Sequence, residues 1–301
     1  MALLLVRAPS YNRLTTSQAV VPRGDVLSLF QPYSDDEIAA ATKRARRNII
    51  EMVYAAGSGH PGGSLSSVEI LAALYLRLLR HDPAWPDWPD RDRFVLSKAH
   101  CVPVLYAFLA ETGYLPVEEL TSFRKLNSRL QGHSKMHSVS GVEMSGGSLG
   151  QGLSFSIGQC LAARLDGRDY RVYCLLGDGE LDEGQVWEAA MAAAHYGLGN
   201  LTAIVDRNGV QNDGRVADIM SQEPLADKWR AFGWNVQQID GHDQKAVIAA
   251  LERASFATDG PSVVIAETVK GKGVSFMEGN YVWHGKAPNA EERERALAEI
   301  G

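Results

Sequence analysis

Short apolar runs alternate with amphipathic segments along most of this chain, and this alternation is the feature that most restricts its fold. Runs with the length and character of buried strands occupy residues 94–96, 172–176, 201–206, 235–240 and 262–267. Helical patterns lie near residues 66–80, 103–112, 150–165, 184–196, 223–232 and 243–257. Parallel strands that are joined by helices are covered on both faces. The pattern therefore predicts a doubly wound α/β fold, with a mainly parallel sheet and helices on both of its faces.

The ordered domain is predicted to begin at Ser34 and to extend to residue 301. The sequence SDDE at 34–37 has the form of a capping box, and helical periodicity follows it. The first ten residues, MALLLVRAPS, contain an apolar run that is too brief for a signal sequence and has no charged region before it. Arginines and hydroxyl residues in this segment are also found in transit peptides. We interpret residues 1–33 as a flexible N-terminal arm, or as a strap across a partner.

The composition of the chain argues against several classes of function. The chain of 301 residues carries a formal net charge of -6, which argues against nucleic-acid or membrane-surface binding. No apolar run approaches the roughly 18 residues of a membrane span. Its three cysteines, Cys101, Cys160 and Cys174, have no CxxC spacing and lie in apolar segments. They are expected to be reduced packing residues of a cytoplasmic protein.

Polar residues follow two neighbouring strands of the predicted sheet. GDG at 177–179 comes directly after one strand, and Asn208 follows the next. Ligands of such sheets bind beyond the carboxyl ends of the strands. The Asp178 carboxylate, the Asn208 amide oxygen and a main-chain carbonyl after Asn208 would suit Mg²⁺, and the glycines would let a diphosphate approach the backbone. The alternative is that GDG and NG are merely turns.

Several longer motifs make the chain recognisable. They are AAGSGHPGGSLS at 55–66, DRFVLSKAH at 92–100, SGGSLGQGL at 145–153, GDGELDEGQVWEA at 177–189 and TVKGKGVSFMEGNYVWHGKAP at 268–288. Together with an asparagine about thirty residues after GDG, they resemble the signatures of the transketolase family of thiamine-diphosphate enzymes. The motifs occur in the family's order, and the resemblance covers about residues 34–290.

The resemblance implies two cofactors, thiamine diphosphate and Mg²⁺, and a set of site residues. Asp178, Asn208 and the main-chain carbonyl of Val210 would hold the metal. Cofactor contacts would come from Gly63, Lys98, His100, Gly147, Ser148, Leu149, Gly177, Gly179, Glu180, Asn208, Lys270 and His284. His60, His133, His284 and Glu183 would be the catalytic set. The histidines would lie around the sugar hydroxyls and the proton transfers, with pKa values near working pH.

The remaining predictions concern assembly and departures from the family. Glu183 and Glu188 match glutamates at the contact between cofactor-binding halves, near a two-fold axis. Ala99, Cys101 and Ser134 stand where related sequences more often have glycine, alanine and proline, and we interpret these changes as tuning. His81, His137, His195 and His242 are interpreted as structural, with His242 orienting a loop.

Full-length transketolases also carry a second half that binds the cofactor's aminopyrimidine. The resemblance therefore implies a split enzyme, in which this chain and a separate C-terminal-type subunit form a heterotetramer with two copies of each chain. It would transfer a two-carbon ketol unit from a ketose to an aldose, on sugar or sugar-phosphate substrates. Two alternatives stay open: a split thiamine-diphosphate enzyme with a different donor or acceptor, and a non-catalytic module that binds cofactor or partner.

Overall fold

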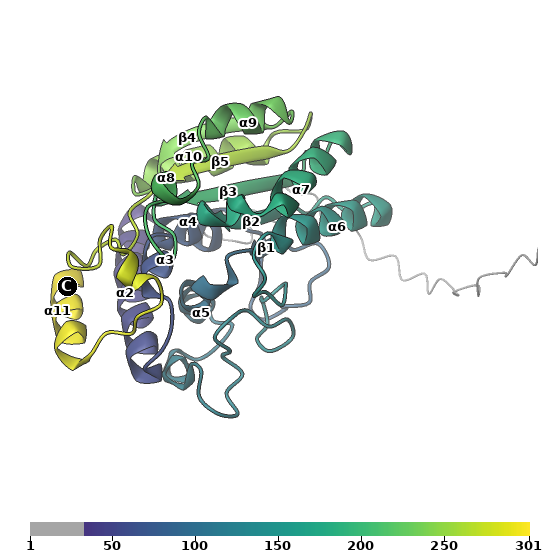
Figure 1. The fold of residues 1–301 in the computed structure, drawn as a ribbon. Coiled ribbons are helices and arrows are strands. Elements are labelled where there is room, and N and C mark those ends of the chain that lie inside the picture. The colour runs from purple at the N-terminus through teal and green to yellow at the C-terminus, as the bar shows by residue number, and fades with distance from the viewer. Residues whose placement is uncertain (1–32) are drawn as a thin grey trace, which may run out of the picture. The chain divides into compact units, whose positions relative to one another are not determined.

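Five parallel strands form the central sheet, in the spatial order β1-β2-β3-β5-β4 (Figure 1). The computed structural model describes residues 33–301, so the predicted arm at 1–33 lies outside the described residues except for Tyr33. The strands are β1 (Arg93–Leu96), β2 (Val172–Gly177), β3 (Leu201–Arg207), β4 (Asn235–Asp240) and β5 (Ser262–Glu267). Every predicted strand is confirmed to within one residue at each end.

Helices fill the connections between the strands. The longer ones are α2 (Asp35–Ala56), α4 (Val68–Ala73), α5 (Val102–Glu111), α6 (Gln151–Asp166), α7 (Gly184–His195), α9 (Leu225–Ala231), α10 (Gln244–Ser255) and α11 (Ala290–Ile300). Shorter turns are α3 (Pro61–Leu65), α8 (Val216–Ile219), a π-helical turn at Leu74–Leu78, and 3-10 turns at Ala99–Cys101, Val117–Ser122, Gly179–Asp182 and Tyr281–His284. The helix predicted at 66–80 is present as α4 followed by the π-helical turn. Ser34 caps α2 through the expected capping box.

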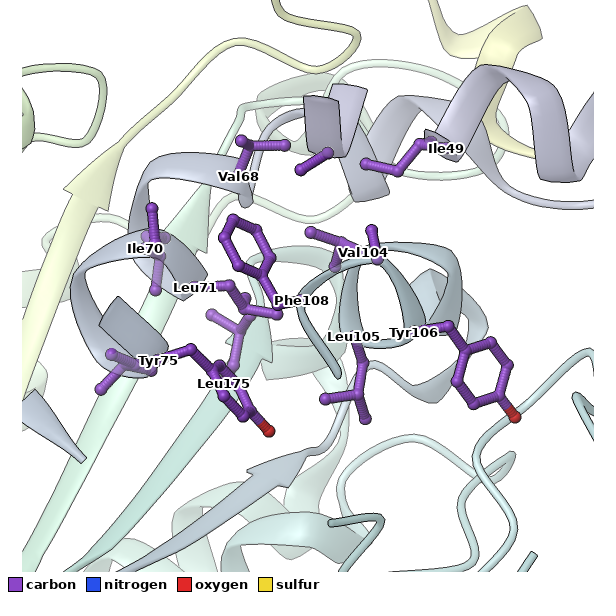
Figure 2. Close-up of a cluster of buried hydrophobic side chains, with 14 of the residues drawn as sticks. Ile49, Val68, Ile70, Leu71, Tyr75, Val104, Leu105, Tyr106, Phe108 and Leu175 are labelled. Carbon is purple, nitrogen blue, oxygen red and sulfur yellow. The ribbon is translucent and has the colours of Figure 1, made fainter. Parts of the chain in front are cut away.

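Helices pack on both faces of the sheet because its strands point alternate side chains to opposite sides. In β2, Tyr173 and Leu175 join the core beneath α2, α4, α5 and α10, whereas Cys174 and Leu176 join the core beneath α6, α7 and α9. Figure 2 shows part of the first core, where side chains of α4 and α5 meet Leu175. The predicted doubly wound α/β fold is confirmed.

The strand order gathers the chemically interesting loops at one edge. In the parallel register, Gly177 of β2 pairs with Asp206 of β3, and Asp206 pairs with Ala266 of β5. The residues that follow these three strands therefore leave the sheet side by side. They belong to the 178–183, 208–215 and 268–288 segments, which contain part of the GDGELDEGQVWEA motif, Asn208 and the TVKGKGVSFMEGNYVWHGKAP motif.

Two negative findings concern the described part of the chain. None of its helices combines the length and apolar character needed to cross a membrane. Cys101, Cys160 and Cys174 are buried and unpaired in disulfides, as predicted for packing residues.

Candidate active site

The loops after β2 and β3 are tied together through Asp178. Its carboxylate accepts the backbone N–H of Gly179 at 2.8 Å and that of Gly209 at 2.5 Å. Gly209 has φ 76°, a left-handed conformation that glycine adopts without strain, and this turn directs its N–H toward Asp178. The Asn208 Oδ1 atom in turn accepts the backbone N–H of Val210 at 3.1 Å. The three predicted metal ligands thus belong to one small network.

The chemistry of this set fits a hard cation that is shared with phosphate. Burial and the nearby charge of Asp206 raise the pKa of Asp178 to about 6, although two backbone N–H groups and Lys270 act in the opposite direction. No group of three or more His, Cys, Asp or Glu side chains within residues 33–301 is arranged for a metal. A set of one carboxylate, one amide and one carbonyl leaves coordination positions for phosphate oxygens and water, which Mg²⁺ prefers.

A buried ion pair fixes the orientation of Asn208. The Lys98 ammonium donates to Asp206 at 2.5 Å, and Asp206 also accepts the Asn208 Nδ2–H at 3.0 Å. Because the amide nitrogen faces Asp206, the amide oxygen faces the Val210 N–H. Lys98 also donates to the Ser67 hydroxyl at 2.7 Å and to the Gly63 carbonyl at 2.9 Å. Protein acceptors therefore take all three ammonium hydrogens of Lys98, which acts here as a positioning group.

Lys270 is placed differently. Its ammonium donates to the Val210 carbonyl at 2.8 Å and to His284 Nδ1 at 2.9 Å, which leaves one hydrogen for a ligand. Burial lowers the pKa of Lys270. Since Nδ1 of His284 accepts, the proton of its neutral imidazole lies on Nε2. The Val210 carbonyl keeps a second lone pair, which is compatible with a metal.

Four histidines from separate segments form one cluster. The His60 ring centroid lies 5.1 Å from that of His100, 5.8 Å from that of His133 and 5.4 Å from that of His284. The His100 and His284 rings stack at 5.0 Å. His60 Nδ1 is buried without a hydrogen-bond partner. An unsatisfied polar atom in such a cluster marks a place for a ligand.

The histidines are neutral over a wider pH range than the sequence predicted. Burial, together with the charges of Arg124, His133 and Lys270, lowers the pKa of His60 to about 4. Burial and Lys270 lower the pKa of His284 to about 3. The expectation of pKa values near working pH therefore does not hold for these two rings. A neutral imidazole can still donate one hydrogen bond and accept another.

Glycines leave space around these groups. A Cβ atom on Gly63 would lie 2.6 Å from Cys101 Sγ and 3.9 Å from His100 Nε2. A Cβ atom on Gly179 would lie 2.8 Å from that of Gln211. By contrast, Gly147 faces open space, with no atom within 4 Å of its Cβ position. Ser148 is exposed and Leu149 is half-buried beside it, so this segment can contact a ligand or a partner.

The Glu180 side chain serves the scaffold. Its buried carboxylate accepts the backbone N–H of Gly150 at 2.9 Å, the backbone N–H of Gly177 at 3.0 Å and the Ser97 hydroxyl. The direct cofactor contact that was expected of Glu180 stays a prediction. Glu180 connects the loop after β1, the loop after β2 and the start of α6.

The second glutamate, Glu183, occupies the N-cap position of α7 without a side-chain capping hydrogen bond and is exposed, as is Glu188 five residues further on. Within residues 33–301 no hydrogen bond joins Glu183 to the histidine cluster, so its predicted catalytic role stays a prediction. His242 orients the loop before Lys270, as predicted: Nε2 accepts the Val269 N–H at 2.8 Å, and Nδ1 lies 3.1 Å from Glu69.

Sequence reasoning missed three residues of the site. Ser97 supports Glu180, Asp206 supports Lys98 and Asn208, and Gln222 donates to the Asp178 carbonyl at 2.5 Å. Ser97 directly precedes Lys98, and Asp206 is the last residue of the predicted strand, two residues before Asn208, so both could have been identified from their positions in the sequence. Gln222 lies in a loop without a motif.

Comparisons with known proteins bear on this site. The family model described as "Transketolase, thiamine diphosphate binding domain" matches residues 37–301. The chain is 47% identical over 255 residues to a 6-deoxy-6-sulfo-D-fructose transketolase subunit of a Clostridium species, covering 85% of this chain and 93% of the relative. It is 42% identical to one of the subunits of an apulose-4-phosphate transketolase from Phocaeicola vulgatus, covering 86% of this chain and 92% of the relative.

Solved structures that resemble this chain are also transketolases. The transketolase of Campylobacter jejuni superposes with a TM-score of 0.85 at 35% identity, covering 89% of this chain and 43% of that chain. The match therefore takes in most of this chain and less than half of the Campylobacter protein. The chain belongs to the transketolase family and corresponds to its thiamine-diphosphate-binding domain.

Proposed function

We propose that this chain is the diphosphate-binding subunit of a two-chain transketolase. With a separate aminopyrimidine-binding subunit, it transfers a two-carbon ketol unit from a ketose to an aldose. The observation that carries the proposal is the network of Asp178, Asn208 and Val210, which Lys270 joins to the histidine cluster. A metal position and a proton-transfer position thus lie at one edge of the sheet.

Charge supports a Mg²⁺–diphosphate pair at this edge. Lys98 and Asp206 neutralise each other, and Lys270, Asp178 and Glu180 are further buried ionic groups near them. Adding a divalent cation together with a diphosphate would therefore bring opposite charges that largely cancel. Asp178, Asn208 and Val210 would hold the metal. Lys270, His100 and the glycine-lined space near Gly63 and Gly147 would receive the diphosphate and the rest of the cofactor.

Bound thiamine diphosphate supplies the nucleophilic carbon and the electron sink for ketol transfer. The residues of this chain orient the sugar and move protons. The Nε2–H of His284 can donate to a sugar oxygen, and the free Nδ1 of His60 can bind a sugar hydroxyl. His133, at the edge of the cluster, would bind a further hydroxyl.

The proposed partner supplies the half that binds the aminopyrimidine. The two relatives above are named as subunits and match over nearly their whole length, whereas the Campylobacter transketolase extends well beyond the matched region. We propose a cytoplasmic heterotetramer with two copies of each chain. The names of those relatives also favour the second candidate function, a transketolase whose sugar is not a standard one, such as a sulfonated or branched sugar.

The experiment is to purify the chain with its partner and to measure both cofactor binding and ketol transfer. Calorimetry should show thiamine-diphosphate binding that requires Mg²⁺, and chelation of the metal should abolish both binding and transfer. Binding that persists unchanged after the metal is removed would contradict the proposed metal site. A complex that binds cofactor but transfers no ketol unit would favour the non-catalytic module.

A further inference from the structure

The loop that carries Lys270 is held on both sides of that residue. Val269, just before it, donates its backbone N–H to His242 Nε2 at 2.8 Å. Lys272, two residues after it, accepts the Arg46 Nε–H with its carbonyl oxygen at 3.2 Å. His242 lies in the loop after β4 and Arg46 lies on α2. Side chains from two other parts of the chain therefore fix the backbone around Lys270.

Both of these side chains meet at the carboxylate of Glu69, on α4. Its Oε1 atom accepts the Arg46 Nη2–H at 2.5 Å, and its Oε2 atom lies 3.1 Å from His242 Nδ1. Since His242 Nε2 accepts the Val269 N–H, the proton of the neutral ring lies on Nδ1 and is donated to Glu69. Among the described residues, the Glu69 side chain makes no hydrogen bond to the histidine cluster. It reaches the loop through Arg46 and His242.

The Glu69 carboxylate is ionised although it is buried, as is Arg46. Burial alone would raise the pKa of Glu69, but the hydrogen bonds and charges of His242 and Arg46 outweigh this effect and hold the pKa below its ordinary value. Arg46 also packs closely on the loop, because a Cβ atom on Gly273 would lie 3.0 Å from its Nε. One buried negative charge thus orients two donors that contact the same loop.

We propose that Glu69 is a positioning residue for the cofactor site. Its carboxylate fixes the tautomer of His242 and the direction of the Arg46 guanidinium, and these two groups fix the loop of Lys270. A glutamine at this position has one oxygen, so it can accept from one of the two donors and would turn its NH2 group toward the other. The inference rests on the proposed function for the identity of the cofactor.

The position of Lys270 matters to two parts of the site. Its ammonium donates to the Val210 carbonyl, a proposed metal ligand, and to Nδ1 of His284 in the histidine cluster. A displaced loop would withdraw the ammonium from both acceptors. Glu69, which is proposed to touch neither cofactor nor sugar, would in this way affect the metal and the histidines together.

The tautomer of His242 and the exchange of the Val269 amide test the proposal without cofactor or partner. In the full chain with isotope-labelled histidine, NMR should place the His242 ring proton on Nδ1, and the spectrum of His242→Gln assigns the signal. Glu69→Gln should move part of this proton population to Nε2. Hydrogen exchange of the Val269 amide should then be about 10- to 100-fold faster, because this buried donor loses its acceptor. A wild-type proton on Nε2, or unchanged exchange in Glu69→Gln, would overturn the proposal.

Glu111→Gln is the matched control. Glu111 also pairs with an arginine of α2, Arg44, and its side chain is 14% exposed, compared with 12% for Glu69. Within residues 33–301, neither Glu111 nor Arg44 is hydrogen-bonded to the 268–274 loop. Equally fast exchange of Val269 in this control would overturn the proposal, because loss of any ion pair on α2 would then loosen the loop.

A second variant decides if Glu69→Gln does not fold. Glu69→Asp keeps the charge but shortens the side chain by one methylene, so the carboxylate is withdrawn from its two donors. Exchange of the Val269 amide should be faster than in the wild-type chain. Unchanged exchange in a folded Glu69→Asp chain would overturn the proposal.

Cofactor binding separates this proposal from the proposed function. In the two-chain enzyme, Glu69→Gln should weaken Mg²⁺-dependent binding of thiamine diphosphate by about 10- to 100-fold, the range that outer-shell partners of a metal contribute. KM for the sugar should change little. A loosened loop with unchanged cofactor affinity would overturn the link between Glu69 and the site and leave the proposed function standing. Absence of cofactor binding in the wild-type complex would overturn the proposed function, whereas the His242 and Val269 results would stand.

Discussion

Asp178 is the residue on which cofactor binding depends most directly. Asp178→Ala removes the charged metal ligand from a loop, so the fold should stay largely intact. The loss in thiamine-diphosphate affinity should exceed the about 10–100-fold that outer-shell partners of a metal contribute. Calorimetry in the presence of Mg²⁺ measures this loss, and Asp213→Ala, an exposed acid in the neighbouring loop, is the control. Unchanged affinity in Asp178→Ala would show that the metal lies elsewhere.

His60 should separate chemistry from cofactor binding. Its ring lies in the histidine cluster with Nδ1 unpaired, and none of its hydrogen bonds joins the Asp178 network. His60→Ala should therefore retain the cofactor and lower kcat by about 100- to 10,000-fold, the usual range for a proton-transfer group. His137→Asn, at an exposed left-handed position that asparagine tolerates, is the control. Loss of the cofactor with unchanged substrate affinity would contradict this division of roles.

At the residue scale, the sequence predicted which residues belong to the site better than it predicted their hydrogen-bond partners. The proximity of Asp178 and Asn208 followed from their positions after two strands, and the histidines came from the family motifs. The role of Lys98 could not be predicted, because its three acceptors lie 31, 35 and 108 residues away from it in the chain. The same holds for Glu180, whose carboxylate is satisfied by groups 3, 30 and 83 residues away.

Among the secondary-structure elements, strands were predicted more closely than short helices. Four of the five strands are brief apolar runs that are largely buried, which is a strong signal for a parallel sheet, whereas β4 lies at the edge of the sheet and is partly exposed. The short helix α3 has the sequence PGGSL, and two glycines in five residues give it a low helix propensity. It forms because all five residues are buried against other elements. Such tertiary stabilisation leaves no periodic pattern in the sequence.

The contact between the 3-10 turn at Ala99–Cys101 and the 145–150 segment should be sensitive to volume. A Cβ atom on Gly146 would clash with that of Ala99, where related sequences more often have glycine. Gly146→Ala should lower the free energy of unfolding by about 1–3 kcal/mol through overpacking. Ala99→Gly in the same chain should restore most of it. Denaturant unfolding of the two single variants and of the double variant measures how far their effects on the free energy of unfolding depend on each other. Purely additive changes in this free energy would exclude the clash.

Glu180 should act on three segments at once. Glu180→Ala leaves the backbone N–H groups of Gly150 and Gly177 without their acceptor, at a cost of about 1–3 kcal/mol for each buried donor. We expect reduced stability and weaker cofactor binding together, because the glycine-rich segment at 147–149 loses its anchor. Glu252→Ala, an exposed glutamate on α10, is the control. Weaker cofactor binding without any loss of stability would instead support the direct contact first expected of Glu180.

At the scale of the whole molecule, α6 and α7 leave large apolar side chains exposed to solvent. On the outer side of α6 and α7, Leu165 is 87% exposed and Met191 is 57% exposed. Glu183 and Glu188 are exposed on the same pair of helices. A contiguous exposed apolar patch would mark an interface between subunits, whereas single exposed apolar side chains are normal on a protein surface. The position of the two glutamates near a two-fold axis therefore stays a prediction that follows from the family resemblance.

This chain should be inactive without its partner subunit. Its described residues provide groups for the metal, the diphosphate and the sugar, but the aminopyrimidine has no identified partner among them. The purified chain with Mg²⁺ and thiamine diphosphate should therefore show little ketol transfer, and adding the partner chain should restore it. Ketol transfer should rise during the titration in proportion to a species whose mass, measured by light scattering, corresponds to two copies of each chain. The Asp178→Ala chain is the control, since it should assemble with the partner and remain inactive. Full transfer by the unaccompanied wild-type chain would refute the two-subunit arrangement, because every group needed for catalysis would then have to lie within these 301 residues.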